Sequence, residues 1–122
     1  MGSLKRVAVV DDDPSLCRSF SRLLRLAGYE PSAFLSAEDF LAESERGGFA
    51  CLLLDIQLSG MSGIELQRAM SARGDPTALI FVTAHDEPAL RAEAMQAGCA
   101  GFFSKGDDGE RILAAVKRAV HD

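Results

Sequence analysis

Acidic residues that directly follow apolar segments are the part of this sequence best suited to chemistry. Asp11, Asp12 and Asp13 come after the apolar run 7–10, and Asp55 comes after a second apolar run. Carboxylates that meet in one cleft about 5 Å apart repel each other by about 3 kcal/mol per pair at an effective dielectric constant of about 20. A hard divalent cation removes that repulsion, and Mg²⁺ prefers such oxygen ligands. The acidic residues therefore predict a metal site.

Asp55 is the candidate nucleophile, because a carboxylate beside a bound metal can attack phosphorus and form an aspartyl-phosphate. Phosphoryl transfer then depends on positioning and on neutralising charge. Two further polar side chains, Thr83 and Lys105, follow apolar runs later in the chain. Lys105 supplies a positive point charge for phosphoryl oxygens, and the Thr83 hydroxyl supplies a hydrogen-bond donor. The predicted chemistry is phosphoryl transfer to Asp55, with Asp11 and Asp12 as metal ligands.

Short apolar runs alternate five times with helical patterns, which predicts an α/β fold. The expected strands are 7–10, 30–35, 51–54, 78–82 and 100–103. Fully apolar strands that alternate with helices indicate a parallel sheet covered on both faces. We expect a flavodoxin-like (βα)5 doubly wound parallel sheet with strand order 2-1-3-4-5. Ligands of such sheets bind beyond the carboxyl ends of the first and third strands, which is where the acidic residues lie.

Capping residues predict where the elements begin and end. Asp13 followed by Pro14 marks the start of the first helix. Ser36 marks the start of the second helix, and Gly47–Gly48 marks its end. Pro31 cannot donate a backbone hydrogen bond, so the second strand is expected at an edge of the sheet.

Length and charge limit the class of protein. A chain of 122 residues suffices for one domain, and a net charge of −5 argues against binding nucleic acid through general electrostatics. No apolar run approaches the roughly 20 residues of a membrane helix, and no signal peptide is recognisable. Three cysteines without a C-x-x-C pair indicate reduced thiols rather than a zinc site. We expect one cytoplasmic domain over 1–122, with 1–4 flexible or derived from a tag, that binds neither membrane nor nucleic acid.

Glycine-rich phosphate-binding motifs do not occur in the chain. Both G-x-x-x-x-G-K-[ST] and G-x-G-x-x-G are absent. A flavin or nucleotide carrier of this fold needs such a cradle after the first strand, whereas here that loop holds three acids, which repel phosphate without a metal. No organic cofactor is therefore expected.

Four short motifs resemble those of the receiver domain of bacterial two-component response regulators. They are Val9–Asp13, Leu53–Ile56, Val82–Ala84 and Phe102–Lys105. Each motif alone is weak, but the four in this order and spacing are specific, and the resemblance covers nearly the whole chain. It implies a signalling domain that is not an enzyme, apart from promoting its own phosphorylation and dephosphorylation.

The resemblance implies a role for each matching residue in the site. Asp55 is the phosphorylated aspartate, Asp12 coordinates Mg²⁺ (or Mn²⁺) directly, and Asp11 does so largely through water. The backbone carbonyl of Gln57 is a further metal ligand, and Lys105 pairs with the phosphoryl group. The phosphoryl donor is a phosphohistidine on a sensor histidine kinase or on a phosphotransfer protein.

Two residues are implied to transmit the phosphorylated state outward. Thr83 turns toward the phosphoryl group, and Phe102 moves from an exposed to a buried position, whereas the neighbouring Phe103 is expected in the core. This changes the surface of the fourth helix, fifth strand and fifth helix, where an effector domain, a target protein or a second protomer of a homodimer docks. Gln57 and His85 are candidates for tuning hydrolysis of the acyl phosphate.

The chain departs from the usual pattern of the family at two positions. Gly106 follows Lys105 where the family often has a proline after a cis peptide bond, so a trans bond and a looser loop are expected. Ser59 stands where a proline is frequent, between Asp55 and Gly60. Neither departure removes a reacting group.

Two other functions stay open on the sequence alone. The segment Asp11–Ser15 loosely resembles the D-x-D-x-T loop of haloacid dehalogenase-type phosphatases, which would make Asp11 the nucleophile. Against this, the chain lacks room for a cap and Asp55 would have no role. The second alternative is a receiver-like interaction module that is never phosphorylated, against which stand the complete acid set and Lys105.

Overall fold

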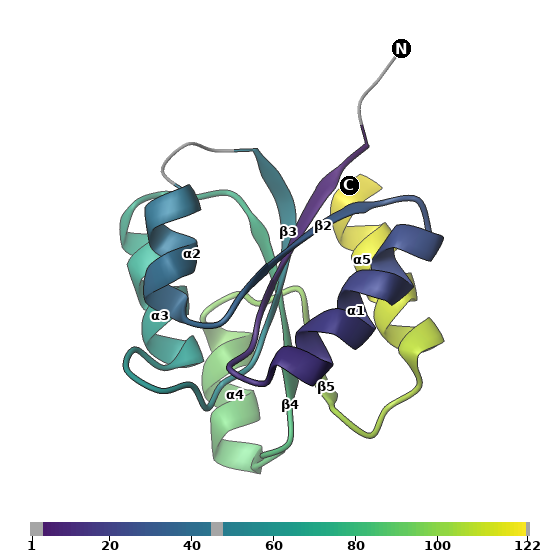
Figure 1. Ribbon diagram of the computed structural model, residues 1–122. Coiled ribbons are helices and arrows are strands. Elements are labelled where there is room, and N and C mark those ends of the chain that lie inside the picture. The colour runs from purple at the N-terminus through teal and green to yellow at the C-terminus, as the bar shows by residue number, and fades with distance from the viewer. Residues whose placement is uncertain (1–3, 45–47, 122) are drawn as a thin grey trace.

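A parallel sheet of five strands lies between two layers of helices (Figure 1). The computed structural model describes residues 4–44 and 48–121. The neighbouring strands pair in parallel in the order β2-β1-β3-β4-β5, which confirms the predicted fold class. The strands are β1 (Arg6–Val10), β2 (Glu30–Phe34), β3 (Phe49–Leu54), β4 (Ala78–Thr83) and β5 (Gly101–Ser104). The helices are α1 (Pro14–Leu26), α2 (Ala37–Ser44), α3 (Gly63–Ala72), α4 (Pro88–Gln96) and α5 (Gly109–His121).

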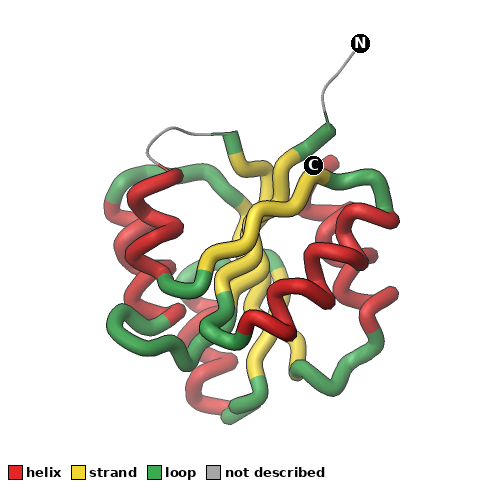
Figure 2. Tube along the Cα trace, in the orientation of Figure 1, coloured by secondary structure: helices red, strands yellow, loops and turns green. Residues whose placement is uncertain are grey.

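Helices α1 and α5 cover one face of the sheet, and α2, α3 and α4 cover the other (Figure 1). In Figure 2 the yellow strands separate these two groups of red helices. Successive residues of a strand point to opposite faces. Strand β1 therefore sends Val7 and Val9 into the core beside α1 and α5, and Ala8 and Val10 into the other core. Because both faces are buried, the central strand β3 is apolar throughout.

The predicted helix starts are confirmed by hydrogen bonds. The side chain of Asp13 accepts from the backbone N–H of Ser15 at 2.9 Å and caps α1, with Pro14 in the first turn. Ser36 likewise accepts from the N–H of Asp39 at 3.1 Å at the start of α2.

Strand β2, which contains Pro31, lies at the sheet edge as predicted. Helix α2 ends at Ser44. Of the predicted stop, Gly47 lies outside the described residues, and Gly48 has a φ of +102°. Residues 1–3 of the segment expected to be flexible also lie outside the described residues.

Four strands begin earlier or end later than the sequence predicts. Strand β1 begins at Arg6, β3 begins at Phe49, β4 ends at Thr83 and β5 ends at Ser104. Backbone pairing is the reason, because Phe49 pairs with Arg6 and Thr83 pairs with Ser104. Thr83 is therefore held in the sheet and not in a loop.

The register of the sheet brings the two acidic segments together. Val10 pairs with Leu54, so Asp11 and Asp55 leave neighbouring strands at the same level. The backbone N–H of Asp55 donates to the carbonyl of Val10 at 3.0 Å, and that of Asp11 donates to the carbonyl of Phe34 at 3.1 Å. These bonds extend the sheet ladder into the site.

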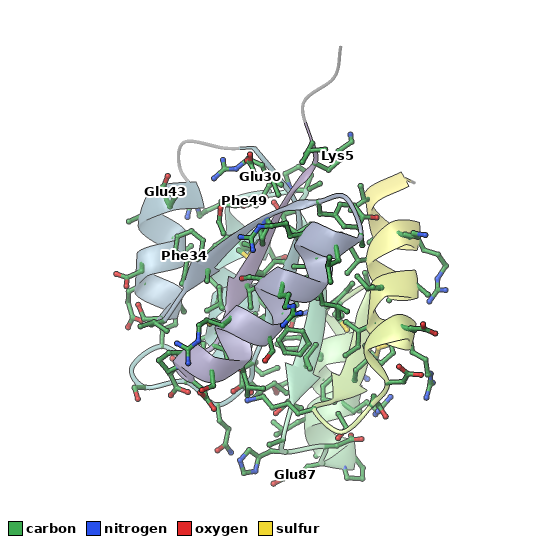
Figure 3. All side chains as sticks on the ribbon, turned by 45° about the vertical axis from the view of Figure 1, so that its right-hand side comes forward. Lys5, Glu30, Phe34, Glu43, Phe49 and Glu87 are labelled. Atoms are coloured by element: carbon green, nitrogen blue, oxygen red, sulfur yellow. The ribbon has the colours of Figure 1, made fainter. Side chains whose placement is uncertain are left out.

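The two ends of the sheet are distinct in Figure 3. Lys5 and Glu30 lie at the end where the strands begin, and Glu87 lies at the opposite end, in the loop between β4 and α4. The acidic segments follow the strands at this second end, as the strand order predicts.

The cysteines and the helix lengths relate to two further expectations, which are reduced thiols and no membrane-spanning helix. Cys17, Cys51 and Cys99 are free and buried. The potential metal-binding group found among residues 4–44 and 48–121 contains carboxylates and no thiol. Within the same ranges, every helix is too short or too polar to cross a membrane.

Candidate functional site

Three carboxylates gather beyond the carboxyl ends of β1 and β3. Oxygen atoms of Asp11, Asp12 and Asp55 lie within 4.8 Å of one another. Asp11 and Asp55 are only 3% and 5% exposed, whereas Asp12 is exposed. The structure thus brings together the three acids that the sequence assigns to one edge of the sheet.

The ammonium group of Lys105 lies between the two buried carboxylates. Its Nζ is 2.9 Å from Asp11 Oδ2 and 3.0 Å from Asp55 Oδ2. Lys105 directly follows β5, and its backbone N–H donates to the carbonyl of Thr83 at 2.9 Å. The sheet therefore fixes the backbone from which this side chain reaches the acids.

Burial and mutual contact shift the pKa values of Asp11 and Lys105. Burial raises the pKa of Asp11, and hydrogen bonds from Asp13 and Lys105 offset only part of that effect. Burial also lowers the pKa of Lys105, but its hydrogen bonds to Asp11 and Asp55 and their negative charges outweigh burial, so this pKa is raised overall. The ammonium group contacts two of the three carboxylates, so the cluster has more acidic groups than basic ones.

The donor set of the cluster fits a hard divalent cation. Mg²⁺ and Mn²⁺ prefer oxygen ligands, and Mg²⁺ commonly uses one or two carboxylates together with water. The pKa of Asp11 is raised by burial even with Lys105 beside it, so further positive charge would stabilise its ionised form. Asp12, the exposed member, is accessible to a hydrated ion.

Backbone N–H groups orient the two buried carboxylates. Asp13 donates to Asp11 Oδ1 at 2.9 Å, and Gln57 donates to Asp55 Oδ1 at 3.4 Å. Each carboxylate is thus held by a backbone donor on one oxygen and by Lys105 on the other. The carbonyl of Gln57 belongs to the same loop, and its role as a metal ligand stays a prediction.

Thr83 ends β4 and is fully buried. Its hydroxyl oxygen accepts a hydrogen bond from the backbone N–H of His85 at 3.0 Å. A hydroxyl that accepts one bond keeps its own proton for a second acceptor. His85 lies exposed in the loop that follows, and the tuning role of its side chain stays a prediction.

Phe102 occupies a buried position and is 6% exposed. Its ring centroid lies 5.8 Å from that of Phe81, and the guanidinium of Arg91 lies over it at 4.7 Å. Arg91 also pairs with Asp86 at 3.1 Å. Sequence reasoning missed Arg91, although an acid and an arginine flanking the start of α4 were a possible signal. Phe103 packs in the opposite core, as predicted.

The loop between β3 and α3 borders the acidic cluster. The Ser59 hydroxyl donates to Asp12 Oδ2 at 3.5 Å, and the N–H of Met61 donates to Glu38 Oε2 of α2 at 3.0 Å. Sequence analysis missed both contacts, because the partners are 47 and 23 residues apart and no local pattern joins them.

Glycines shape two loops of the site. A Cβ at Gly63 would collide with the carbonyl oxygen of Asp55, so only glycine allows α3 to begin this close to the site. The bond between Lys105 and Gly106 is trans, as expected. Contrary to a loose loop, Ser104 donates through its N–H to Asp107 Oδ2 at 2.9 Å and accepts from the N–H of Gly106 at 3.3 Å.

Comparison with known proteins identifies the family. The family model for the response regulator receiver domain matches residues 7–117. Response regulator protein TodT of Pseudomonas putida is 32% identical over 114 residues, which are 93% of this chain and 50% of that protein. Transcriptional regulatory protein FixJ of Azorhizobium caulinodans is 35% identical, over 93% of this chain and 54% of that protein. The chain thus spans about half the length of these curated relatives.

Solved structures agree with this match. Response regulator StyR superposes with a TM-score of 0.90 at 36% identity, over 98% of this chain and 60% of that chain. The structure described as FixJ-N gives a TM-score of 0.89 at 30% identity, over 99% and 96%. A CheY-like receiver domain of Methanospirillum hungatei gives 0.88 at 30% identity, over 98% and 95%. Since family model, relatives and fold all point the same way, the chain belongs to the receiver domains of response regulators.

Proposed function

We propose that this receiver domain accepts a phosphoryl group on Asp55 and signals its phosphorylation to an output domain or a partner protein. The observation that carries the proposal is the bridging position of Lys105, whose Nζ lies 3.0 Å from Asp55 and 2.9 Å from Asp11. This places a positive charge beside the oxygen that would carry the phosphoryl group, where a charge-assisted hydrogen bond is strong.

Asp55 is the nucleophile of the proposed reaction. A carboxylate oxygen attacks the phosphorus of a phosphohistidine, so that a P–O bond forms while the P–N bond breaks and its electron pair leaves with the imidazole. Lys105 then exchanges its contact with the carboxylate for one with the phosphoryl oxygens. The free proton of the Thr83 hydroxyl donates to the same group.

We assign a divalent cation, Mg²⁺ or Mn²⁺, to the acidic cluster. Its proposed ligands are Asp11, Asp12, Asp55 and the backbone carbonyl of Gln57. When bound, the ion neutralises charge on the transferring phosphoryl group. The backbone donors on the two buried carboxylates hold them in place beforehand, which lowers the cost of assembling the site.

The proposed signal leaves the site through Thr83. Its hydroxyl is bonded to the N–H of His85 at 3.0 Å, so a movement of Thr83 toward the phosphoryl group carries the β4–α4 loop with it. That loop leads into α4, where Arg91 lies over Phe102. The surface of α4, β5 and α5 would then change for an effector domain, a target protein or a second protomer. Gln57 and His85 would tune the lifetime of the acyl phosphate.

The proposed partners follow from the family. A sensor histidine kinase or a phosphotransfer protein would supply the phosphoryl group. The matched region covers 56% and 54% of two curated relatives named as transcriptional regulatory proteins, so an effector domain would be a natural output. With a net charge of −5, the domain itself would not bind nucleic acid. We propose a single cytoplasmic domain over residues 1–122 that acts on no other substrate.

The test is the intact mass of the protein after incubation with acetyl phosphate and Mg²⁺. Wild type should gain one phosphoryl group, Asp55→Asn should gain none, and a chelator should suppress the gain. Asp75→Asn is the matched control, because Asp75 accepts from Thr77 in the loop before β4, away from the acidic cluster. It should be phosphorylated like wild type.

Other outcomes would identify the alternatives. A phosphoryl group retained in Asp55→Asn but lost in Asp11→Asn, with steady phosphate release from many monoesters, would indicate a haloacid dehalogenase-type phosphatase. Failure of every donor, including kinases, would indicate an interaction module that is never phosphorylated.

A further inference from the structure

The loop between β3 and α3 is anchored to a second element, α2. Glu38, in the first turn of α2, accepts from the N–H of Met61 at 3.0 Å. Gly60 has a φ of +78°, and a Cβ there would lie 2.6 Å from Glu38 Oε2. Glycine adopts this φ without strain, and the absence of a Cβ leaves room for the Glu38 carboxylate. The loop is therefore shaped to receive the Glu38 carboxylate.

The anchored loop presents Ser59 to the exposed acid of the site. Asp11 and Asp55 are buried and are each held by Lys105 and a backbone N–H. Asp12 is exposed, and within the described part of the chain its carboxylate has the Ser59 hydroxyl as hydrogen-bond donor, at 3.5 Å. Among the three acids, Asp12 is thus the one that a side chain of this loop contacts within the described residues.

A restraint on Asp12 matters because ligand side chains lose freedom when they bind a metal. A partner that orients the ligand beforehand reduces that cost, and the loss of such a partner commonly weakens metal affinity. The Ser59 hydroxyl is such a partner for Asp12.

We propose that Ser59 is a positioning residue for the Asp12 metal ligand, and that Glu38 acts through it by holding the loop. The inference rests on the proposed function, because it requires a divalent cation at the acidic cluster. Removing either side chain should weaken cation affinity about two- to tenfold, the range for the loss of one hydrogen bond. The reacting groups on Asp55 and Lys105 stay unchanged in both variants.

The experiment measures binding of Mn²⁺ alone, from the electron paramagnetic resonance signal of the free ion. The variants are Ser59→Ala, Glu38→Ala and the double variant. Matched controls are Glu110→Ala, which removes an acid from the first turn of α5, and Ser71→Ala, which removes an exposed serine from the end of α3.

Both single variants should raise the dissociation constant for Mn²⁺, and both controls should leave it unchanged. The two residues act through one contact. The double variant should therefore raise the dissociation constant by a factor smaller than the product of the two single-variant factors. The unfolding midpoint of Ser59→Ala in chelator should equal that of wild type, which separates orientation of the ligand from loss of structure.

Two results would overturn the inference. An unchanged dissociation constant in Ser59→Ala would remove the role of Ser59, and fully multiplicative effects would show that Glu38 does not act through it. Failure of the proposed function has a different signature: wild type would not bind Mn²⁺, or Asp12→Asn would bind it as tightly as wild type.

Discussion

Lys105 lies between Asp11 and Asp55 and pairs with both buried carboxylates. Burying a carboxylate costs several kcal/mol unless it is paired and hydrogen-bonded. Lys105 satisfies one oxygen of each acid, and backbone N–H groups satisfy the other. For Asp11 these contacts offset only part of the effect of burial, and its pKa stays raised.

We expect Asp11 to make the metal-free protein less stable as pH rises. Burial raises its pKa above the ordinary value of 3.8, so the folded state holds the proton more tightly than the unfolded state. Its stabilising contribution is complete below the unfolded pKa and is lost as pH rises through the folded pKa. Relative to Asp11→Asn, wild type should lose about 1.4 kcal/mol of unfolding free energy per unit of pKa difference.

Urea unfolding of both proteins in chelator, from about pH 3.5 upward, would measure this loss. The comparison with Asp11→Asn cancels the titration of carboxylates outside the acidic cluster. A stability difference that stays constant with pH would contradict a raised pKa for Asp11 in the folded protein. Adding Mg²⁺ at neutral pH should restore stability to wild type more than to Asp11→Asn.

At the scale of elements, α4 is attached to the sheet by few contacts. Ala94 is its one buried residue, and its N-terminus has no side-chain cap. Gln67 of α3 donates to the carbonyl of Ala94 at 3.1 Å. Arg91 holds the N-terminal half, through Asp86 on one side and the ring of Phe102 on the other. A helix held this way can change position at low cost, which suits an output surface.

Arg91→Ala should therefore loosen α4 selectively. An exposed ion pair and a cation–π contact together contribute about 1 kcal/mol. Amide hydrogen exchange in α4 should accelerate about fivefold, because 1 kcal/mol of local stability corresponds to that factor. Arg118→Ala, an exposed arginine of α5, is the control and should leave α4 unchanged. Equal acceleration in α1 and α5 would show that Arg91 supports the whole fold instead.

At the scale of the whole molecule, the sheet separates two cores that both contain thiols. Cys17 and Cys51 lie in the core beside α1 and α5, and Cys99 lies in the core beside α2, α3 and α4. Cys51, in the central strand β3, is fully buried. Chemical modification of each thiol therefore reports the opening of the part of the domain in which that thiol is buried.

Native protein should protect Cys51 from alkylation. Burial raises its pKa to about 12, and the thiolate is the reactive form. Iodoacetamide at about pH 8 should leave Cys51 unmodified in the folded state, whereas all three thiols should react in urea. Peptide mass mapping assigns the adducts, and Cys51→Ala confirms the assignment. Rapid native alkylation of Cys51 would mean that β3 opens far more readily than a central strand should.

The sequence by itself determined the order of the elements and the chemical types at the end of each strand. Apolar runs, caps such as Asp13 and the edge proline Pro31 act over a few residues. Each of them therefore predicts the element in which it lies without knowledge of the rest of the fold. The general rule for parallel sheets then places Asp11 and Asp55 at one edge. These features account for the correct strand order and for the three acids of the cluster.

Only the tertiary structure decided how the site is held. Lys105 bridges two acids from different strands, Ser59 reaches Asp12, and Glu38 anchors the loop between β3 and α3. Each contact joins residues that are far apart in the chain. Such contacts depend on sheet register, on close approaches and on side-chain rotamers, and none of these leaves a periodic trace in the sequence. The physical reason is that burial patterns repeat along an element, whereas a hydrogen bond between elements depends on where both have docked.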